Sequence, residues 1–321
     1  MASLAKFAVV FCAILAGAAT AIADKSTIQV FALPEGTHPH DVAPAPDGTV
    51  WYTAQAAGAL GILDPRSGKS RQVPLGDGSA PHGVIAGPDG AAWITDGGLN
   101  AIVRFDPATE KLTKFLLPAD AADANLNTAA FDGKGRLWFT GQGGFYGRLD
   151  PGTGAMRVFK APRGRGPYGI TVTPTGEVWY CSLAGDHIAR IDLESGAATI
   201  VEPPRKGVGP RRIWSDSKAM LWVSFWNAGG IGRYDPAKKI WTHYPMPQSR
   251  SSTYAVYVDD KDRIWATDWA ANAIQRFDPV TESYATFPSD KRGANVRQML
   301  GRPGEAWGGE SGNDRLVVVR D

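Results

Sequence analysis

Seven tryptophans recur at nearly equal intervals and constrain the fold of this chain more than any other feature. Each lies in a similar frame, in which a short apolar run and a turn such as Pro46-Asp47-Gly48 precede the tryptophan segment. A second turn and a further apolar segment follow it. Repetition at a period of about 20–50 residues is typical of solenoids and propellers. The seven residues, spaced 41 to 45 positions apart, are Trp51, Trp93, Trp138, Trp179, Trp222, Trp265 and Trp307.

The segments within each repeat have the composition of β-strands. They are four to six residues long, rich in Val, Ile, Trp, Phe and Tyr, and bounded by Gly, Pro, Asp and Asn. Asp-Pro pairs such as Asp64-Pro65 fit the turns between strands, because Asp bonds the backbone ahead of it and Pro fixes the turn dihedral. Four strands in each of seven repeats predict an all-β fold, a seven-bladed β-propeller with four-stranded blades.

The count of fourth strands predicts how the ring closes. Six repeats end in a fourth apolar segment, whereas the seventh reaches the C-terminus without one. The missing strand is present at the other end of the chain, as TIQVFALP at 27–34. We therefore expect the N-terminal strand to pair with the last blade, which removes an exposed strand edge. The tryptophans are expected to pack between blades, each burying about 150–250 Å².

The first residues predict an exported protein. Residues 1–23 combine a basic Lys6, an apolar core over 7–18 and an Ala21-Ile22-Ala23 cleavage signal, which together are typical of a secretory signal peptide. Residues 24–321 then form a single propeller domain. Cys12 lies in the leader, so the mature chain keeps only Cys181 and cannot form an internal disulfide. We expect a periplasmic or secreted protein without membrane association after cleavage.

The charge balance narrows the class of partner. The chain has 34 basic and 32 acidic residues in 321 and no polybasic tract. Duplex nucleic acid is therefore not an expected partner. We expect a monomer that takes a small molecule or a peptide in its central funnel.

Two positions of each repeat are expected to meet at one face of the propeller. The residue eleven before the tryptophan opens the innermost strand, and the residue three after the tryptophan ends the second strand. The first position is polar in six of seven repeats, which an apolar strand does not require, and it predicts a ligand-binding funnel. Trp226 and Trp269 follow the second strands of repeats five and six and provide aromatic faces for a ligand. The polar members of the first position are His40, His82, Asn127, Tyr168, Arg211 and Tyr254.

The repeat motif resembles that of a known family. The segment 81–104, PHGVIAGPDGAAWITDGGLNAIVR, follows the pattern P-H-G-[IV]-x(3)-P-D-G-x-x-W-[IFY]-T-[DE]…N-x-I-x-R. This pattern is similar to the repeats of the streptogramin B lyases, also called virginiamycin B lyases, over essentially the whole mature chain. The resemblance implies a seven-bladed propeller. It also implies a lyase that linearises a cyclic depsipeptide by elimination at its ester, with help from Mg²⁺.

The resemblance also implies roles for individual residues. Family members carry two histidines that open adjacent blades, and His40 and His82 match that pair. His40 would contact the substrate and His82 would accept the proton. Asp96 occupies the slot of a carboxylate that helps to hold the metal. The histidine pair lies in the first two repeats, whereas the family's lies in its last two, and Ala80 stands where the family has a glutamate two residues before the catalytic histidine.

Several alternatives stay open at the level of sequence. Glu310 and Asp268 form another carboxylate pair for metal or acid–base work, and Arg211 or Arg212 could stabilise an enolate without metal. A calcium-dependent lactonase or esterase would need convergent oxygen ligands, for which Glu310 and Asn127 are candidates. A non-catalytic periplasmic propeller that binds a peptide, glycan or protein at its funnel is the third function class.

Overall fold

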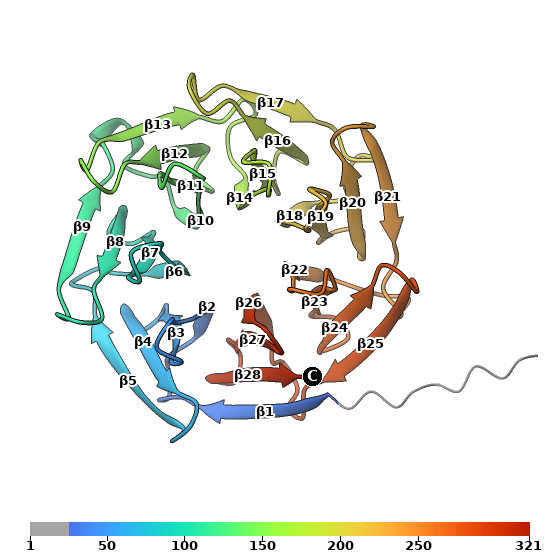
Figure 1. The fold of residues 1–321 in the computed structure, drawn as a ribbon, viewed down its shortest axis with the longest axis horizontal. Coiled ribbons are helices and arrows are strands. Elements are labelled where there is room, and N and C mark those ends of the chain that lie inside the picture. Colours follow the sequence, from blue (N-terminus) through green and yellow to red (C-terminus); the bar gives the residue numbers. More distant parts are fainter. Residues whose placement is uncertain (1–25) are drawn as a thin grey trace, which may run out of the picture.

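The computed structural model describes residues 26–321, so the predicted signal peptide at 1–23 lies outside the described residues. Within them the chain forms 28 strands and the short 3-10 helix η1 (Ala119–Ala121). The strands make seven four-stranded antiparallel sheets that surround a common axis, and the chain runs once around the ring (Figure 1). The predicted all-β, seven-bladed propeller with four-stranded blades is confirmed.

Each blade is a meander whose innermost strand comes first in the sequence. Blade 1 contains β2 (Pro39–Pro44), β3 (Val50–Ala54), β4 (Ala59–Asp64) and β5 (Lys69–Pro74). Blade 2 contains β6 (Pro81–Ala86), β7 (Ala92–Asp96), β8 (Ala101–Phe105) and β9 (Leu112–Leu116). Blade 3 contains β10 (Leu126–Phe131), β11 (Leu137–Gly141), β12 (Phe145–Leu149) and β13 (Met156–Lys160).

The remaining blades repeat this order around the ring. Blade 4 contains β14 (Pro167–Val172), β15 (Val178–Ser182), β16 (His187–Ile191) and β17 (Ala198–Val201). Blade 5 contains β18 (Pro210–Ser215), β19 (Leu221–Phe225), β20 (Ile231–Asp235) and β21 (Ile240–Tyr244). Blade 6 contains β22 (Thr253–Val258), β23 (Ile264–Asp268), β24 (Ala273–Asp278) and β25 (Ser283–Pro288). Blade 7 contains β26 (Val296–Arg302), β27 (Glu305–Glu310), β28 (Arg315–Arg320) and β1 (Thr27–Ala32).

Blade 7 closes the ring by joining the two ends of the chain. β1 pairs antiparallel with β28 over its whole length, from Thr27 opposite Arg320 to Ala32 opposite Arg315. Figure 1 shows the two strands side by side at the rim. Phe31 of β1 stacks on Trp307 of β27 with ring centres 5.6 Å apart. The predicted closure by the N-terminal strand is therefore confirmed, and it anchors that strand to the core.

The repeated tryptophans fill the seams between blades. Trp51 of blade 1 packs with Val84 and Ile94 of blade 2, and Trp93 of blade 2 packs with Leu126 and Phe139 of blade 3. Several of the indole N–H groups donate to an acid of the preceding turn, as Trp138 does to Asp132 at 2.8 Å. The same Asp132 carboxylate accepts backbone N–H groups of its turn. One acid thereby fixes both the turn and the tryptophan.

A hydroxyl two residues after each of several tryptophans ties neighbouring inner strands together. Thr53 donates to the carbonyl of His82 at 2.8 Å, and Ser224 donates to the carbonyl of Tyr254 at 2.9 Å. Cys181 occupies the same slot in blade 4, with its Sγ 2.7 Å from the carbonyl oxygen of Arg211. This thiol is fully buried, and burial raises its pKa to about 12. Each link positions the backbone of a residue that faces the axis.

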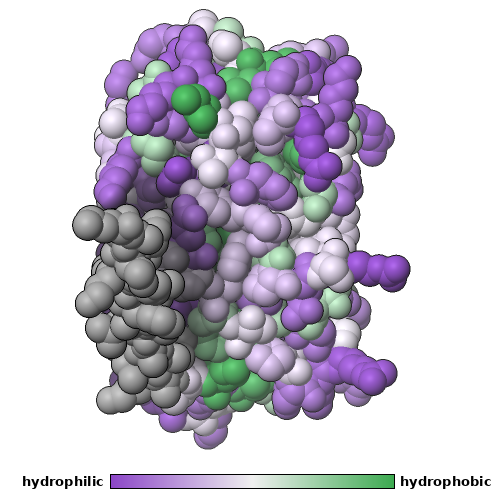
Figure 2. Space-filling view, turned by 90° about the vertical axis from the view of Figure 1, so that its right-hand side faces the viewer, coloured by the Kyte–Doolittle hydropathy of each residue, from purple (hydrophilic) through white to green (hydrophobic). Residues whose placement is uncertain are grey.

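The side of the disc carries mostly polar side chains, with apolar ones in separate small groups (Figure 2). Exposed large apolar residues such as Leu116 and Ile240 belong to the outermost strands. Between residues 26 and 321, no helix has the length and apolar character that crossing a membrane would require.

Candidate functional site

The innermost strand of every blade is irregular near its first residues. The register between first and second strands shifts there in all seven blades, between Pro39 and Val42 in blade 1 and between Val296 and Met299 in blade 7. A β-bulge inserts an extra residue and re-aims side chains, so two successive residues need not point to opposite faces. The polar position predicted to face the axis lies inside these irregularities, together with the residue that follows it.

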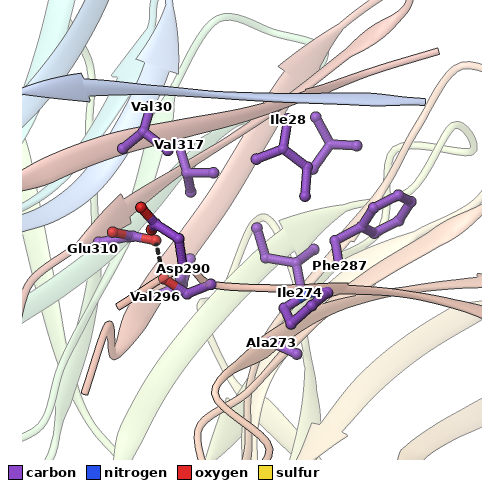
Figure 3. Close-up of a pocket in the computed structure, with 12 residues that line it drawn as sticks. Ile28, Val30, Ala273, Ile274, Phe287, Asp290, Val296, Glu310 and Val317 are labelled. Carbon is purple, nitrogen blue, oxygen red and sulfur yellow. Dashed lines mark hydrogen bonds between the residues drawn. The ribbon is translucent and has the colours of Figure 1, made fainter. Parts of the chain in front are cut away.

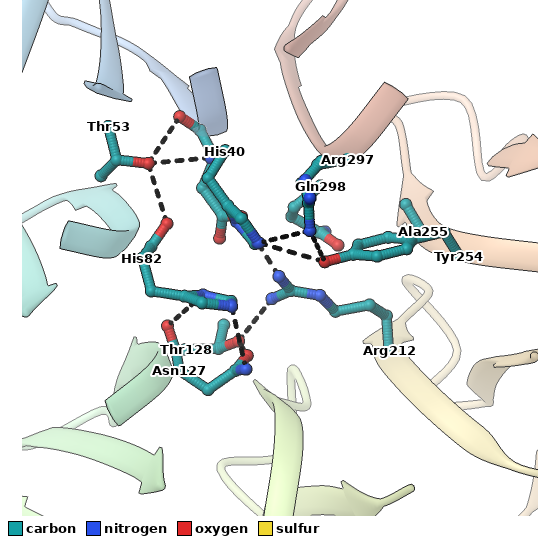
Figure 4. Close-up of polar contacts among 12 residues, drawn as sticks. His40, Thr53, His82, Asn127, Thr128, Arg212, Tyr254, Ala255, Arg297 and Gln298 are labelled. Atoms are coloured by element: carbon teal, nitrogen blue, oxygen red, sulfur yellow. Dashed lines mark hydrogen bonds and ion pairs between the residues drawn. The ribbon is translucent and has the colours of Figure 1, made fainter. Parts of the chain in front are cut away.

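The two histidines of the first blades meet at the axis (Figure 4). Their ring centres are 3.7 Å apart. His40 is 1% exposed and His82 is 6% exposed, so both rings are covered by other side chains. The contact brings together the two imidazoles that the sequence placed in adjacent blades.

His40 is held in one tautomer by partners on both ring nitrogens. Its Nδ1 lies 2.7 Å from Oδ1 of Asp41, and because a carboxylate only accepts, Nδ1 carries the proton. Its Nε2 accepts from the hydroxyl of Tyr254 at 3.1 Å and from Nη1 of Arg297 at 3.2 Å. Burial first, and the neighbouring arginines second, hold the pKa of His40 well below its usual range. The ring is therefore neutral, with its lone pair on Nε2.

Both ring nitrogens of His82 form hydrogen bonds with one residue, Asn127. Its Nδ1 donates to the backbone carbonyl of Asn127 at 3.1 Å, and its Nε2 accepts from the side-chain amide of the same residue at 3.1 Å. Burial and the adjacent His40 hold the pKa of His82 well below its usual range. Asn127 in turn accepts from the hydroxyl of Thr128 at 2.7 Å. His82 is thus neutral as well, but no carboxylate orients it directly.

Three arginines converge on the same point. The guanidinium carbons of Arg211, Arg212 and Arg297 lie 3.8, 5.9 and 5.6 Å from the ring centre of Tyr254. Arg212 is buried and pairs with Asp41 at 3.1 Å while it also donates to Thr128. Arg211 donates to the hydroxyl of Tyr168 at 2.8 Å. The axis is therefore rich in positive charge.

Tyr254 lies at the centre of this charge. Its oxygen is 2.9 Å from that of Tyr168, and since Tyr254 donates to His40, the Tyr168 hydroxyl donates to Tyr254. Burial alone would raise the pKa of the Tyr254 phenol, but the three arginines outweigh burial and lower it to about 8. A continuous hydrogen-bonded chain runs from Tyr168 through Tyr254 and His40 to Asp41.

Aromatic side chains cover this network on one side. Trp269 stacks face to face on Tyr254 with ring centres 4.8 Å apart, and Trp226 meets Trp269 edge-on at 5.4 Å. Trp226 and Trp269 are half-buried, as are Arg211 and Arg297, whereas Tyr254 is fully buried. The structure thus gathers every residue of the predicted substrate-binding set around His82: His40, Asn127, Tyr168, Arg211, Tyr254, Trp226 and Trp269.

Comparison with known proteins identifies the family to which this chain belongs. The profile of the virginiamycin B lyase family matches residues 68–320. The chain belongs to the virginiamycin B lyase family. The crystal structure of virginiamycin B lyase from Staphylococcus aureus superposes with a TM-score of 0.85 and 22% identity, over 92% of this chain and 100% of that one. A comparison with curated protein sequences finds no match.

Two further solved structures share the fold. A catalytically inactive histidine-to-alanine variant of the S. aureus virginiamycin B lyase with quinupristin has a TM-score of 0.84 and 22% identity, over 92% of this chain and 100% of that one. The extracellular domain of a candidate hybrid two-component system from B. thetaiotaomicron has a TM-score of 0.71 and 16% identity. That match covers 91% of this chain and 42% of the other. At these identities the likeness shows the fold alone.

The carboxylates named as metal ligands do not join the histidines in this family member. Asp96 accepts from the hydroxyl of Ser79 at 2.5 Å and from backbone N–H groups of its own blade. Asp268 likewise accepts three backbone N–H groups on Oδ1, although its buried Oδ2 has no partner. Glu310 pairs with Arg315 and accepts from Ser289 at 2.9 Å. Each of the three carboxylates is therefore engaged by groups of its own neighbourhood. None of these contacts joins Glu310 to Asn127, the two candidate ligands for calcium.

The residues at the axis do not fit Mg²⁺. Within residues 26–321, one group of three His, Cys, Asp or Glu side chains lies close enough to share an ion, namely His40, Asp41 and His82. Mg²⁺ prefers oxygen ligands in octahedral geometry, and this group offers a single carboxylate. That carboxylate already pairs with Arg212, and Arg297 donates to Nε2 of His40. An added divalent cation would therefore lie against two guanidinium groups.

Three residues of the site escaped the sequence analysis: Asp41, Thr128 and Arg297. Arg297 is the blade-7 counterpart of His40, because Val296 pairs with Glu310 as Pro39 pairs with Ala54, and blade 7 is one residue shorter before its tryptophan. Asp41 and Thr128 lie ten residues before their tryptophans, one position after the polar ring. Regular strand alternation would turn this position away from the axis, and only the bulges bring it there. Its occupancy by Asp41, Thr128 and Arg212 in blades 1, 3 and 5 was the signal available.

An apolar cavity of about 260 Å³ lies elsewhere, between blades 6 and 7 (Figure 3). Ile28, Val30, Phe287 and Val317 line it, with Asp290 and Glu310 at one end. None of the axial histidines, arginines or tyrosines contributes to its wall. The candidate chemistry therefore lies at the axis and not in this cavity.

Proposed function

We propose that this protein is a carbon–oxygen lyase that opens an ester-containing cyclic peptide, or a related ester, at the axial site. The observation that carries the proposal is the Asp41–His40 pair, which keeps the proton on Nδ1 and the basic lone pair on Nε2. In the elimination, the base removes a proton from the carbon next to a carbonyl group. The electron pair forms a carbon–carbon double bond, the ester C–O bond breaks, and a carboxylate leaves.

His40 is better placed than His82 to accept that proton. Asp41 fixes the proton of His40 on Nδ1, which is the arrangement by which a third group orients a general base. A positioned base of this kind contributes about 10²–10⁴ in rate. His82 lies beside it without a carboxylate partner and contacts the substrate in this proposal. The two roles are thus the reverse of those that the family resemblance implied.

The arginines supply the positive charge that the developing enolate needs. Preorganised donors in a site shielded from water stabilise charge that appears only in the transition state. Arg297 lies beside Nε2 of His40, and Arg212 is held by Asp41 on the other side of the ring. No step of this mechanism passes through a metal ion.

Access to the base requires a side-chain movement. Nε2 of His40 is covered by Tyr254 and Arg297. Arg297 is half-buried, and its Nε bonds the hydroxyl of Ser311 at 3.0 Å. We propose that the substrate displaces the Arg297 guanidinium from His40. The displaced guanidinium then binds the substrate.

Incubation with a type B streptogramin followed by mass spectrometry tests the proposal. A linear product of unchanged mass is expected from elimination, with and without a chelator of divalent cations. His40→Ala should abolish this product, and His82→Ala should weaken substrate binding more than it slows the chemical step. A product that has gained one water would replace the lyase with a hydrolase. The inactive histidine-to-alanine variant of the S. aureus enzyme supports a histidine in this role.

Burial of both imidazoles favours a second candidate function, a propeller that binds a ligand without transforming it. A similar propeller is the extracellular domain of a candidate signalling protein. Binding of a streptogramin without any product, at enzyme concentrations that exceed those of the substrate, would select this function over the lyase.

We further propose that the protein is exported to the periplasm or the cell exterior and acts as a monomer there. The support is the sequence of residues 1–23 and the closed ring, which leaves no blade without its fourth strand. N-terminal sequencing should find Asp24 first, and light scattering should give the mass of one chain.

A further inference from the structure

The axis carries more positive charge than its own acids can balance. Arg211, Arg212 and Arg297 all approach the Tyr254 ring, and both histidines are neutral. Among the residues that the structure describes, Asp41 is the one carboxylate that pairs with any of the three. Across residues 26–321, Arg211 and Arg297 have no carboxylate within 4.0 Å. At least two positive charges are therefore left without a partner of opposite sign.

The buried donors of these arginines are also incompletely used. The Nε groups of Arg211 and Arg212 are buried and have no hydrogen-bond acceptor. Arg212 is 1% exposed, so its guanidinium is shielded from bulk solvent. Buried polar groups in proteins are normally satisfied, and an unpaired donor of this kind indicates a missing partner. A partner that accepts hydrogen bonds would satisfy these donors, and a negatively charged one would also balance the unpaired arginines.

We infer that the axial arginines bind an oxyanion group of the ligand, a carboxylate or a phosphate. Guanidinium groups match such groups geometrically through parallel N–H donors. The half-buried Arg211 and Arg297 contact the oxyanion directly. The buried Arg212 adds the attraction of its positive charge from deeper in the protein. The inference names the ligand chemistry of the site to which the proposed function belongs, but it concerns binding alone and does not require elimination.

The surroundings of the arginines indicate what accompanies the oxyanion. The guanidinium of Arg211 lies 4.6 Å from the ring centre of Trp226, and that of Arg297 lies 5.2 Å from that of Trp269. Both indoles are half-buried and so still present apolar surface. A flat apolar group next to the oxyanion would cover these faces while the oxyanion reaches the arginines.

Calorimetric titration of the purified protein with three probes tests the inference. Benzoate and phenyl phosphate carry the two kinds of oxyanion on one ring, and benzamide carries the same ring without charge. At least one charged probe should bind about tenfold more tightly than benzamide, the difference expected for one charge-assisted hydrogen bond. The tighter charged probe identifies the group. Equal affinity for all three probes, or no binding of either charged probe, would overturn the inference.

Substitution of the half-buried arginines locates the bound probe. Arg211→Gln and Arg297→Gln should each weaken the charged probe by about tenfold, because each removes one charge-assisted contact. Arg66→Gln is the matched control, since Arg66 lies in an exposed turn between β4 and β5. Unchanged affinity in both axial variants would show that the probe binds elsewhere.

A measurement on the unaltered protein covers the case in which a variant fails to fold. Acetate does not absorb at the wavelengths at which tyrosinate absorbs, so it does not disturb the optical measurement. The negative charge of a bound acetate would offset the arginine charges that favour the Tyr254 phenolate. Saturating acetate should therefore move the ionisation of Tyr254 to higher pH at constant ionic strength, and an unmoved midpoint would count against the inference. Failure to turn over a streptogramin would leave these binding results untouched, so the two proposals can fail separately.

Discussion

Tyr254 is expected to lose its proton near pH 8, well before any other tyrosine of the chain. Burial raises the pKa of the other eight: Tyr52, Tyr146, Tyr168, Tyr180, Tyr234, Tyr244, Tyr257 and Tyr284. Tyr254 differs because three arginines surround it and outweigh its burial. A pKa of about 8 instead of about 10 means that the folded protein favours the phenolate by about 2.7 kcal/mol.

Ultraviolet titration of tyrosinate measures this ionisation directly. The chain has nine tyrosines, so one ninth of the total absorbance change should appear in a separate step near pH 8. Tyr254→Phe should remove the step, whereas Tyr257→Phe, a buried neighbour outside the arginine cluster, should keep it. Arg297→Gln should move the step to higher pH because it removes one of the favourable charges.

The same shift has a consequence for stability, and its sign follows from linkage. The pKa of Tyr254 is lower in the folded chain than in the unfolded chain, so the stabilisation appears as pH rises through about 8 and is complete above about 10. The gap in unfolding free energy between the wild type and Tyr254→Phe should widen by about 2.7 kcal/mol over that range. A step near pH 8 that survives in the double variant Tyr168→Phe/Tyr254→Phe would refute the electrostatic reasoning.

Three further sets of substitutions test the hub, a seam between blades and the closure of the ring. Asp41→Asn should lower the free energy of unfolding by about 3–5 kcal/mol, measured in denaturant, because it leaves the Arg212 charge buried and unpaired. Cys181→Thr should keep the stability, Cys181→Val should lose about 1 kcal/mol with its hydrogen bond, and the native thiol should stay unreactive toward a disulfide reagent. Phe31→Ala should cost about 3–5 kcal/mol in thermal or chemical unfolding, whereas Ile28→Ala on the exposed side of β1 should cost much less.

Most of the fold could be predicted because the repeat is a local signal copied seven times. The spacing of the tryptophans fixed the number of blades, and the missing fourth strand in the last repeat predicted the pairing of β1 with β28. Counting a fixed number of residues back from each tryptophan also found His40, His82 and Tyr254. Those residues meet because the same position of each repeat faces the same axis.

The rest of the site could not be read from the repeat, because it depends on departures from regular strand geometry. Asp41 reaches the axis through a bulge, and no residue type in the sequence marks a bulge of this kind. Arg297 takes the place of His40 in blade 7, but that blade is one residue shorter before its tryptophan, so a fixed count reaches Val296 instead. The opposite error concerns Asp96. An acid followed by Gly97 and Gly98 commonly accepts backbone N–H groups of its own turn, which is what Asp96 does with Gly98 and Leu99. A carboxylate committed to its own loop is a poor candidate for a metal.

The seams and the hub of this propeller have different physical functions. Tryptophans, and in several blades a hydroxyl or thiol two residues later, join neighbouring blades without using a side chain that faces the axis. The contacts of the seams therefore do not depend on the hub, and the hub can hold charges that would be costly in a core. Of the charged hub residues, Arg212 and Asp41 are those whose single substitution should destabilise the fold, since removing one leaves the other buried and unpaired. Arg211 and Arg297 pair with no carboxylate of residues 26–321, so their substitution should change ligand binding while leaving the fold intact.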